Sequence, residues 1–292
     1  EQPDGSEHQF LISDPRQATN PRDPNSIGDG QDSAKIDRYQ GYVKAAYQAA
    51  DQAVQRIIDT VGVDSNGKPN SDIIVVSDHG FSPFYTTVDL NSYLKNQGFD
   101  PNQVRAITSG PAANVYINLQ GREPGGTVSR QEYTQLQQQV ADALRSFVDS
   151  NPNYTDGKTS IFDKVYTRPV PNDLNAPNFG LETSEFIGQD TGDVFALLTE
   201  GYNFDGLQTP AVIRLGDPAL STPVLSVPNF YGAHGYDPEL PNMSAIFFAA
   251  GPNIPHGTID RVRDIDIAPT VLQLLNVEPA STVQGESILR SN

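Results

Sequence analysis

Apolar side chains recur at helical spacing in several stretches of the chain. The longest periodic stretch begins at Ser33, which together with Asp32 offers an N-cap, and Gly62 follows its end. In another stretch, Ser129 and Glu132 have the spacing of a capping box. The pattern predicts helices at Ser33 to about Val61, Leu90–Asn96, Ser129–Val148 and Asp264–Leu275. The inward face of the last helix is predicted to consist of Ile265, Ile267, Ala268, Val271, Leu272 and Leu275.

Short apolar runs between these helices predict strands. The clearest is Ile73–Val76, a run of β-branched residues typical of a strand buried on both faces of a parallel sheet. A long helix, a turn and then this strand form half of a βαβ unit, which predicts an α/β fold with a mainly parallel central sheet flanked by helices. Further strands are predicted at Val115–Leu119, Val165–Tyr166, Asp193–Leu198 and Met243–Ala250, with long loops at Arg168–Gly180 and Gly201–Pro228.

Composition narrows the classes of protein that fit this pattern. The 292 residues suffice for one large α/β domain or two smaller ones. The formal net charge of −17 would repel a phosphate backbone and argues against a nucleic-acid scaffold. No apolar run is long enough for a membrane span. The chain has no cysteine, few lysines and many Asn, Gln, Thr and Pro, a composition that favours an extracytoplasmic protein, periplasmic or secreted.

The strand at Ile73–Val76 is followed at once by Ser77-Asp78-His79-Gly80. In open α/β sheets, ligands bind just beyond the carboxyl ends of the strands. A carboxylate and an imidazole at such a place could hold a metal ion, with Gly80 allowing an unusual backbone angle. The alternative is a strand-end turn in which Asp78 caps and His79 is an ordinary surface residue.

The chain has three other histidines, two of which are further candidate ligands. His234 stands beside glycine in the loop Asn229–Tyr236, and His8 follows Asp4 by four residues. His256 comes after Ile254-Pro255 and is predicted to be a surface residue. The acidic residues of the stretch Asp14–Asp32 could suggest a calcium site, but the spacing of these residues fits no EF-hand loop. A solvated surface loop is the preferred interpretation.

These residues together resemble a known family. Asp4 with His8, Asp78-His79-Gly80 and His234-Gly235-Tyr236 are similar to three segments of the alkaline phosphatase superfamily, and the chain looks most like its type I phosphodiesterase/nucleotide pyrophosphatase branch. The stretches Met243–Phe247 and Asp264–Leu275 resemble that branch's closing strand and helix. Glu7 departs from the family, which often has glycine before the histidine; the difference should perturb the loop but not the ligand.

The resemblance implies a two-metal site. Asp4, His8 and His234 would hold one ion, and Asp78 with His79 would hold the other. Imidazole and carboxylate ligands suit zinc, with manganese, iron or magnesium as alternatives. Two such ions can bind the attacking and leaving oxygens of a phosphoryl displacement. The resemblance therefore implies hydrolysis of a small phosphate ester, mono- or diester, through a covalent phospho-enzyme.

The second ion lacks ligands, because a zinc site needs three or four and Asp78 with His79 supply two. In the family, an earlier Asp and a Thr or Ser nucleophile complete it, and both normally precede the segment that contains Asp4. The chain is therefore expected to be the C-terminal portion, residues 1–292, of one catalytic domain whose first strand and nucleophile lie upstream, with an N-terminal fragment as a possible partner. Ser77, Ser82 and Thr86 are expected to serve as turn and capping groups, and Thr270 lies at a helical position that matches a structural segment of the family.

Other functions remain open at this point. Within the same superfamily the chain could be a phosphonate hydrolase, a phosphomutase or a sulfatase, and outside enzymes it could be a non-catalytic remnant that binds metal. Six aromatic residues flank the candidate ligand loops and could either stack on an aryl or nucleoside group or pack internally: Phe81, Phe84, Tyr85, Phe230, Tyr231 and Tyr236.

Overall fold

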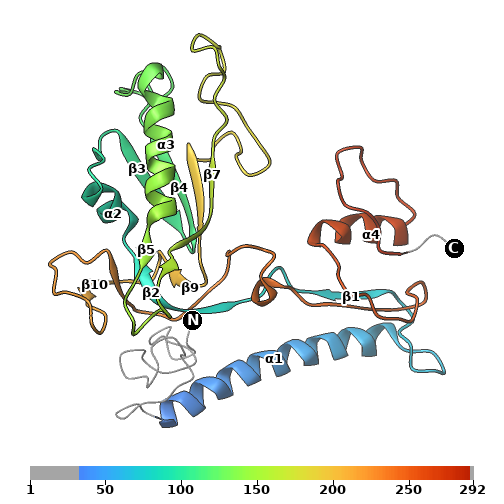
Figure 1. Cartoon of the computed structure of the whole chain (residues 1–292). Coiled ribbons are helices and arrows are strands. Elements are labelled where there is room, and N and C mark those ends of the chain that lie inside the picture. Colours follow the sequence, from blue (N-terminus) through green and yellow to red (C-terminus); the bar gives the residue numbers. More distant parts are fainter. Residues whose placement is uncertain (1–32, 290–292) are drawn as a thin grey trace. The chain divides into compact units, whose positions relative to one another are not determined.

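The computed structural model describes residues 33–289, which form two compact units. Unit 1 contains residues 33–40 and 81–243, and unit 2 contains residues 41–80 and 244–289. All four predicted helices are present (Figure 1). They are α1 Ser33–Val61, α2 Leu90–Asn96, α3 Arg130–Ser146 and α4 Ile267–Leu274, with 3₁₀ turns at Pro241–Met243 and Asp264–Asp266. The expected single domain is not tested by this division and stays a prediction.

The larger sheet of unit 1 has four antiparallel strands. In spatial order they are β3 (Val104–Ser109), β4 (Ala112–Ile117), β8 (Val194–Leu198) and β7 (Phe162–Thr167). Helix α3 packs against β7 and β8 and runs along one face of the sheet (Figure 1). Its buried side is lined by Tyr133, Val140 and Leu144. Alternate residues of β4 are fully buried, as expected of a strand with one face on the core.

A second sheet in unit 1 is built around β2 (Ser82–Val88). Strand β11 (Leu225–Pro228) and strand β12 (Gly232–Ala233) pair with it antiparallel, while β9 (Gly201–Asn203) pairs with it in parallel. Strand β10 (Leu207–Val212) extends the sheet beyond β11, and β5 (Val148–Asp149) with β6 (Thr159–Ser160) forms a separate ribbon. The predicted loop Gly201–Pro228 therefore contains three strands, and that prediction was wrong.

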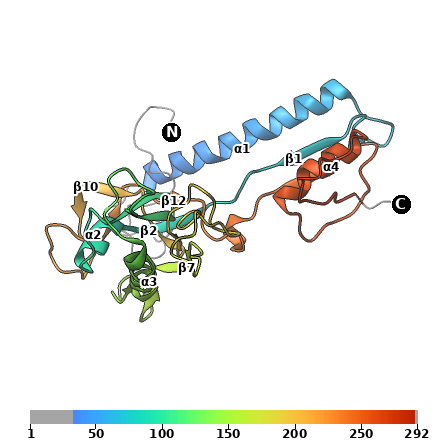
Figure 2. The same ribbon diagram turned by 90° about the horizontal axis from the view of Figure 1, so that it is seen from above.

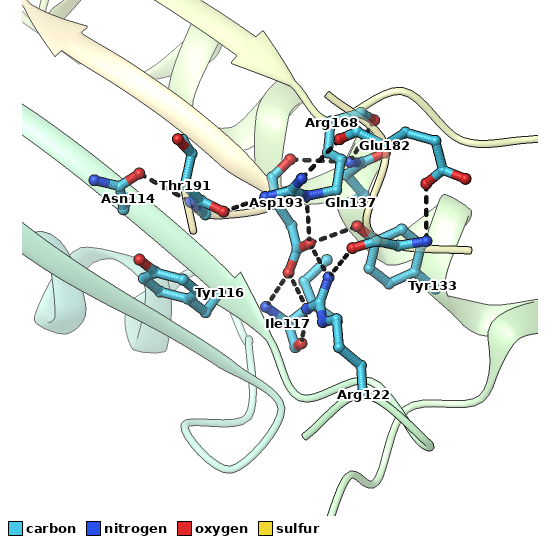
Figure 3. A network of polar contacts seen from close by, with 12 residues as sticks. Asn114, Tyr116, Ile117, Arg122, Tyr133, Gln137, Arg168, Glu182, Thr191 and Asp193 are labelled. Atoms are coloured by element: carbon cyan, nitrogen blue, oxygen red, sulfur yellow. Dashed lines mark hydrogen bonds and ion pairs between the residues drawn. The ribbon is translucent and has the colours of Figure 1, made fainter. Parts of the chain in front are cut away.

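A buried carboxylate ties the sheet of unit 1 to α3 (Figure 3). Asp193, which is 1% exposed, accepts hydrogen bonds from both terminal nitrogens of Arg122, at 2.6 and 2.7 Å. It also accepts one from the Tyr133 hydroxyl of α3 at 2.6 Å and one from the backbone N–H of Ile117 at 2.6 Å. Arg168, also buried, lies 3.5 Å away. The carboxylate charge is thus matched by cations and donors within the core, as a buried charge requires.

Unit 2 is organised around a two-stranded ribbon. Strand β1 (Ile73–Val76) pairs antiparallel with β13 (Phe247–Ala250), from Ile73 opposite Ala250 to Val76 opposite Phe247. In both views α1 and α4 lie on opposite sides of β1 (Figures 1 and 2). No residue of either strand is fully buried; Val76 is 46% exposed and Phe248 is 65% exposed.

These observations correct several predictions. Among the described strands, eight of the nine ladder pairings are antiparallel, so the mainly parallel sheet is not confirmed, although the fold is α/β with sheets and helices. The predicted burial of Ile73–Val76 on both faces is wrong for the described residues. The inward placement of Ile265 and Leu275 is also wrong, because they are 51% and 66% exposed. Periodicity identifies an apolar face, but what that face meets is decided by parts of the chain far away in sequence.

Candidate functional site

The Asp78-His79-Gly80 turn follows β1 directly, as predicted. The backbone N–H of Ser77 donates to the Ile246 carbonyl at 3.2 Å, and the Ile246 N–H donates to the Ser77 hydroxyl at 3.0 Å. These two hydrogen bonds extend the pairing of β1 with β13 as far as the Asp78-His79-Gly80 turn. Ser77 therefore fixes where the turn begins, which agrees with the structural role predicted for it.

Asp78 and His79 present their donor atoms in one direction. The Nδ1 atom of His79 lies 2.7 Å from the Gly80 carbonyl oxygen. A carbonyl can only accept, so Nδ1 carries the hydrogen and Nε2 of the neutral ring carries the lone pair. Nε2 lies 3.4 Å from Oδ2 of Asp78. Two ligands of a tetrahedral zinc ion with bonds of roughly 2.0–2.1 Å are about 3.4 Å apart.

The donor set of this turn thus fits a divalent metal. A backbone carbonyl that accepts from Nδ1, as that of Gly80 does, would fix the tautomer and orientation of a histidine that binds metal through Nε2. The side chain of Asp78 is 85% exposed, and that of His79 is 36% exposed, so an ion can reach both. An ion pair between Asp78 and a protonated His79 would give the same distance. A metal-binding measurement distinguishes the ion pair from a metal site.

His234 lies just beyond β12 in unit 1. Gly235, which follows it, has φ +91°, a conformation that favours glycine. The next residue, Tyr236, is 3% exposed and donates its hydroxyl hydrogen to the Tyr202 carbonyl at 2.8 Å. Burial raises the pKa of the Tyr236 hydroxyl, which keeps it a hydrogen-bond donor. The exposed imidazole of His234 therefore lies between strand β12 and the buried side chain of Tyr236, which fix the position of its backbone.

The remaining predicted ligands, Asp4 and His8, lie outside the described residues, as does the stretch Asp14–Asp32. Between residues 33 and 289, no group of three or more His, Cys, Asp or Glu side chains is placed to hold one ion. His256 is exposed, as predicted.

The candidate hydroxyls are engaged in structural contacts. Ser82 is buried and donates to Glu200 at 2.5 Å, and Thr86 accepts a hydrogen bond from Arg214 at 3.0 Å. Thr270 donates to the Asp266 carbonyl at 2.6 Å within its helix. The turn and capping role predicted for Ser82 and Thr86 is wrong, because both lie within strand β2 and bond to side chains from other parts of the chain. The contact of Thr270 agrees with the structural role expected of it.

A second buried ion pair of unit 1 was not predicted. Arg214 donates to Asp149 at 2.6 and 3.1 Å and to Asp217 at 2.8 Å. Burial alone would raise the pKa of Asp149, but the hydrogen bonds and charge of Arg214 outweigh it and hold that pKa below its usual range. A cavity of about 550 Å³ borders these side chains, and neither Asp78, His79 nor His234 lines it. No short motif marks such a pair, because its members are 65 residues apart.

Comparison with known proteins shows which family the chain matches. A family model described as type I phosphodiesterase / nucleotide pyrophosphatase matches residues 1–237. Two solved structures are similar: human ectonucleotide pyrophosphatase / phosphodiesterase 5, with 20% identity over 74% of this chain and a TM-score of 0.44, and its murine counterpart, with 20% identity over 74% and a TM-score of 0.41. The chain spans 43% and 42% of the length of those two proteins. A search of curated protein sequences gives no match.

Proposed function

Because the chain belongs to the type I phosphodiesterase / nucleotide pyrophosphatase family, we propose that it takes part in metal-dependent hydrolysis of phosphate esters. The observation that carries the proposal is the pair of donor atoms at 3.4 Å, Nε2 of His79 and Oδ2 of Asp78, beyond the end of β1. In this proposal the pair holds one divalent ion, and His234 holds a second together with Asp4 and His8. Zinc is the preferred metal for such ligands.

Each described residue has a definite task in this proposal. The Gly80 carbonyl keeps the proton of His79 on Nδ1, so Nε2 is directed to the ion. Ser77 fixes the start of the turn through its two bonds to Ile246. Gly235 and the buried Tyr236 hold the loop of His234. When bound, the two ions would supply charge to the attacking and leaving oxygens of the phosphoryl group.

We further propose that an upstream part of the natural protein supplies the Thr or Ser nucleophile, the remaining carboxylate ligand and a strand beside β1. The exposure of β1 supports this idea. Among the described residues, its only ladder partner is β13, and its β-branched side chains are partly or largely exposed. A further apolar strand would cover them and complete the hydrogen bonds of the free edge.

An extracytoplasmic location is part of the proposal. It is supported by the composition of the sequence, which has few lysines and many Asn, Gln, Thr and Pro residues. No helix within the described part of the chain is long and apolar enough to span a bilayer.

The metal assignment is tested by replacing single histidines of the natural protein. His79→Ala and His234→Ala should each reduce the zinc content measured by mass spectrometry. Hydrolysis of bis-p-nitrophenyl phosphate should fall by about 100-fold or more, because losing even a hydrogen-bond partner of a metal ligand typically costs about 10–100-fold. His256→Ala is the matched control, since it is an exposed histidine outside the candidate set. Full zinc content or full activity in His79→Ala would contradict the assignment.

The substrate class is tested with two chromogenic esters. Faster turnover of bis-p-nitrophenyl phosphate than of p-nitrophenyl phosphate would assign a diesterase, and the reverse a monoesterase. Activity on a sulfate ester or a phosphonate, with neither phosphate ester cleaved, would favour the other members of the superfamily. Zinc binding with no hydrolysis of any ester would favour a non-catalytic metal-binding protein.

A further inference from the structure

The cavity of about 550 Å³ beside Arg214 lies among three segments of the chain. The C-terminal end of α2 forms one side, residues 147–152 form a second, and the connection between β10 and β11 forms the third. All three segments belong to unit 1, so the cavity is a feature of that unit alone. Its volume falls within the range of about 300–1,000 Å³ that is usual for small-molecule sites.

Much of the cavity wall is apolar. Tyr93 and Phe147 form part of it, and their rings are stacked with centroids 3.8 Å apart. Pro223 is buried in the wall, whereas Val148 and Leu220 are 41% and 54% exposed. These two exposed side chains present apolar surface to water, and a ligand that covered it would gain free energy. The wall therefore suits the hydrocarbon part of a ligand.

The polar part of the cavity is the cluster of Arg214, Asp149 and Asp217, whose side chains are 1%, 2% and 19% exposed. All three guanidinium nitrogens of Arg214 donate to the two carboxylates. Asp149 accepts two hydrogen bonds on each oxygen, because the Asn151 N–H and the Tyr202 hydroxyl add to those from Arg214. Neither Arg214 nor Asp149 therefore has a free position for a ligand.

Asp217 keeps some capacity to accept. Among the described residues, its Oδ2 accepts one hydrogen bond, from Nε of Arg214 at 2.8 Å, and a carboxylate oxygen has two lone pairs. Because two carboxylates share one guanidinium, the cluster also has a formal surplus of one negative charge. A largely buried charge is unfavourable unless a cation or hydrogen-bond donors match it. The free lone pair and the surplus charge both favour a cationic donor.

We propose that this cavity binds a small organic cation, an ammonium group carried on an apolar body. The ammonium donates to Oδ2 of Asp217, and the body lies against the wall that Phe147 and Leu220 help to form. An anion would add to the surplus negative charge. A metal ion suits the cluster less well, because the charge of Arg214, bonded to both carboxylates, would repel it. The inference does not rest on the proposed function, since it uses none of the candidate metal ligands.

The test compares three ligands with similar apolar bodies and different head groups. The natural protein is titrated calorimetrically at neutral pH with 2-phenylethylamine, 2-phenylethanol and 3-phenylpropionate, which are cationic, neutral and anionic. The amine should bind about tenfold more tightly than the alcohol, because a hydrogen bond between two charged partners is the stronger one. The propionate should bind more weakly than the alcohol.

The first variant removes the charge and keeps the shape. In Asp217→Asn the preference for the amine over the alcohol should shrink to about twofold or less, because the ion pair is lost. The affinity for the alcohol should stay within about twofold of that of the natural protein, since the apolar wall is unchanged. Retained binding of the alcohol thus shows that the cavity is intact in the variant.

Two further variants separate the body from the head group and the cavity from the surface. Leu220→Ala should weaken the amine and the alcohol alike, by about threefold or more, because both lose the same apolar contact. Asp142→Asn is the matched control. Asp142 pairs with Arg145 at the same spacing of three residues as Asp217 with Arg214, but its side chain is 62% exposed and outside the cavity. This variant should change neither affinity.

Several results would overturn the inference. These are equal binding of amine and alcohol, no binding of either to the natural protein, or a preference that survives Asp217→Asn. Loss of the alcohol together with the amine in Asp217→Asn would assign this carboxylate to the maintenance of the cavity instead. Loss of the preference in Asp142→Asn would assign it to the overall negative charge of the chain. None of these measurements depends on hydrolysis of a phosphate ester, so they leave the proposed function to its own tests.

Discussion

The two units of this chain bury their strands to different degrees. In unit 1, Ala113, Val115 and Ile117 of β4 are all 0% exposed, and the strand has neighbours on both sides. In unit 2, no residue of β1 reaches that burial, and Val76 at its end is 46% exposed. Strand β1 is a continuous run of β-branched residues, IIVV, whereas β4 has the mixed sequence AANVYI. The more apolar strand is therefore the less buried one, and apolar sequence alone does not determine how deeply a strand is buried.

Polar contacts also differ between the units. Unit 1 contains largely buried ion pairs, such as Asp193 with Arg122. In unit 2, several side-chain hydrogen bonds lie at the ends of its elements: Asp72 to Asn253, Ser77 to Ile246, and Asp266 to Arg263 and to the N–H of Glu286. The candidate ligands Asp78 and His79 thus belong to the less buried unit. We expect unit 1 to resist unfolding more strongly than unit 2.

The largest effect is expected at Asp193. Replacing it by Ala leaves Arg122 and Arg168 buried without their carboxylate, which should lower the free energy of unfolding of unit 1 by about 3–5 kcal/mol. An arginine side chain keeps its charge in proteins, so the variant would leave a largely buried guanidinium with Glu123 as its remaining carboxylate partner. Urea unfolding followed by tyrosine fluorescence measures the change. Asp142→Ala, which removes an exposed partner of Arg145, should change it by less than about 1 kcal/mol.

A matched pair of valines gives the next largest effect. Val115→Ala in β4 removes fully buried methyl groups and should cost about 2 kcal/mol. In a protein limited to residues 1–292, the same change at Val76 in β1 removes half-exposed groups and should cost less than about 1 kcal/mol. In the natural protein, equal losses of stability in the two variants, measured by urea unfolding, would show that β1 is covered and would favour the proposed upstream strand.

The sequence predicted the parts of this fold that depend on local signals. All four helices are present, and the capping box of α3 forms as the spacing of Ser129 and Glu132 requires. Strand β8 begins one residue after its predicted start. Strand β2 was missed, because Ser82–Val88 contains a proline and buries two threonines, Thr86 and Thr87, without clear alternation. Its hydroxyl-rich sequence shows no strand signal until its neighbours are known.

The candidate site was predictable only in part. The order of Asp78, His79 and His234 along the chain suggested a shared chemistry, and the structure adds the 3.4 Å spacing of the first two. The cavity beside Arg214 combines three segments of unit 1 that are far apart in the sequence. The partners of Asp193 and Arg214 are set in the same way by long-range packing, which a pattern in one stretch of sequence cannot encode.

A smaller effect is expected at Asp72, which joins the two strands of unit 2 where β1 begins. Its carboxylate accepts from the Asn253 N–H at 2.9 Å and from the Asn253 side chain at 2.8 Å. Asp72→Ala removes both bonds from a solvent-accessible place and should cost about 1 kcal/mol. Amide hydrogen exchange should quicken in β1 and β13 and stay unchanged in β4. Asp59→Ala, which removes an exposed acceptor within α1, is the control.

The smallest effect is a dependence on pH located in unit 2. The hydrogen bonds from Arg263 hold the pKa of Asp266 at about 2, below the value of about 3.9 expected in the unfolded chain. Between these values the unfolded state binds the proton more readily, so the contribution of Asp266 is complete above about pH 5 and is lost as the pH falls through 4 toward 2. Asp266→Asn should flatten this part of the stability curve of unit 2, as measured by hydrogen exchange of α4 between pH 5 and 2.5. An unchanged slope in the variant would assign the acid sensitivity to other carboxylates. The charge of Arg263, whose side chain is 53% exposed, is partly screened by solvent, so the loss should be smaller than that in Asp193→Ala.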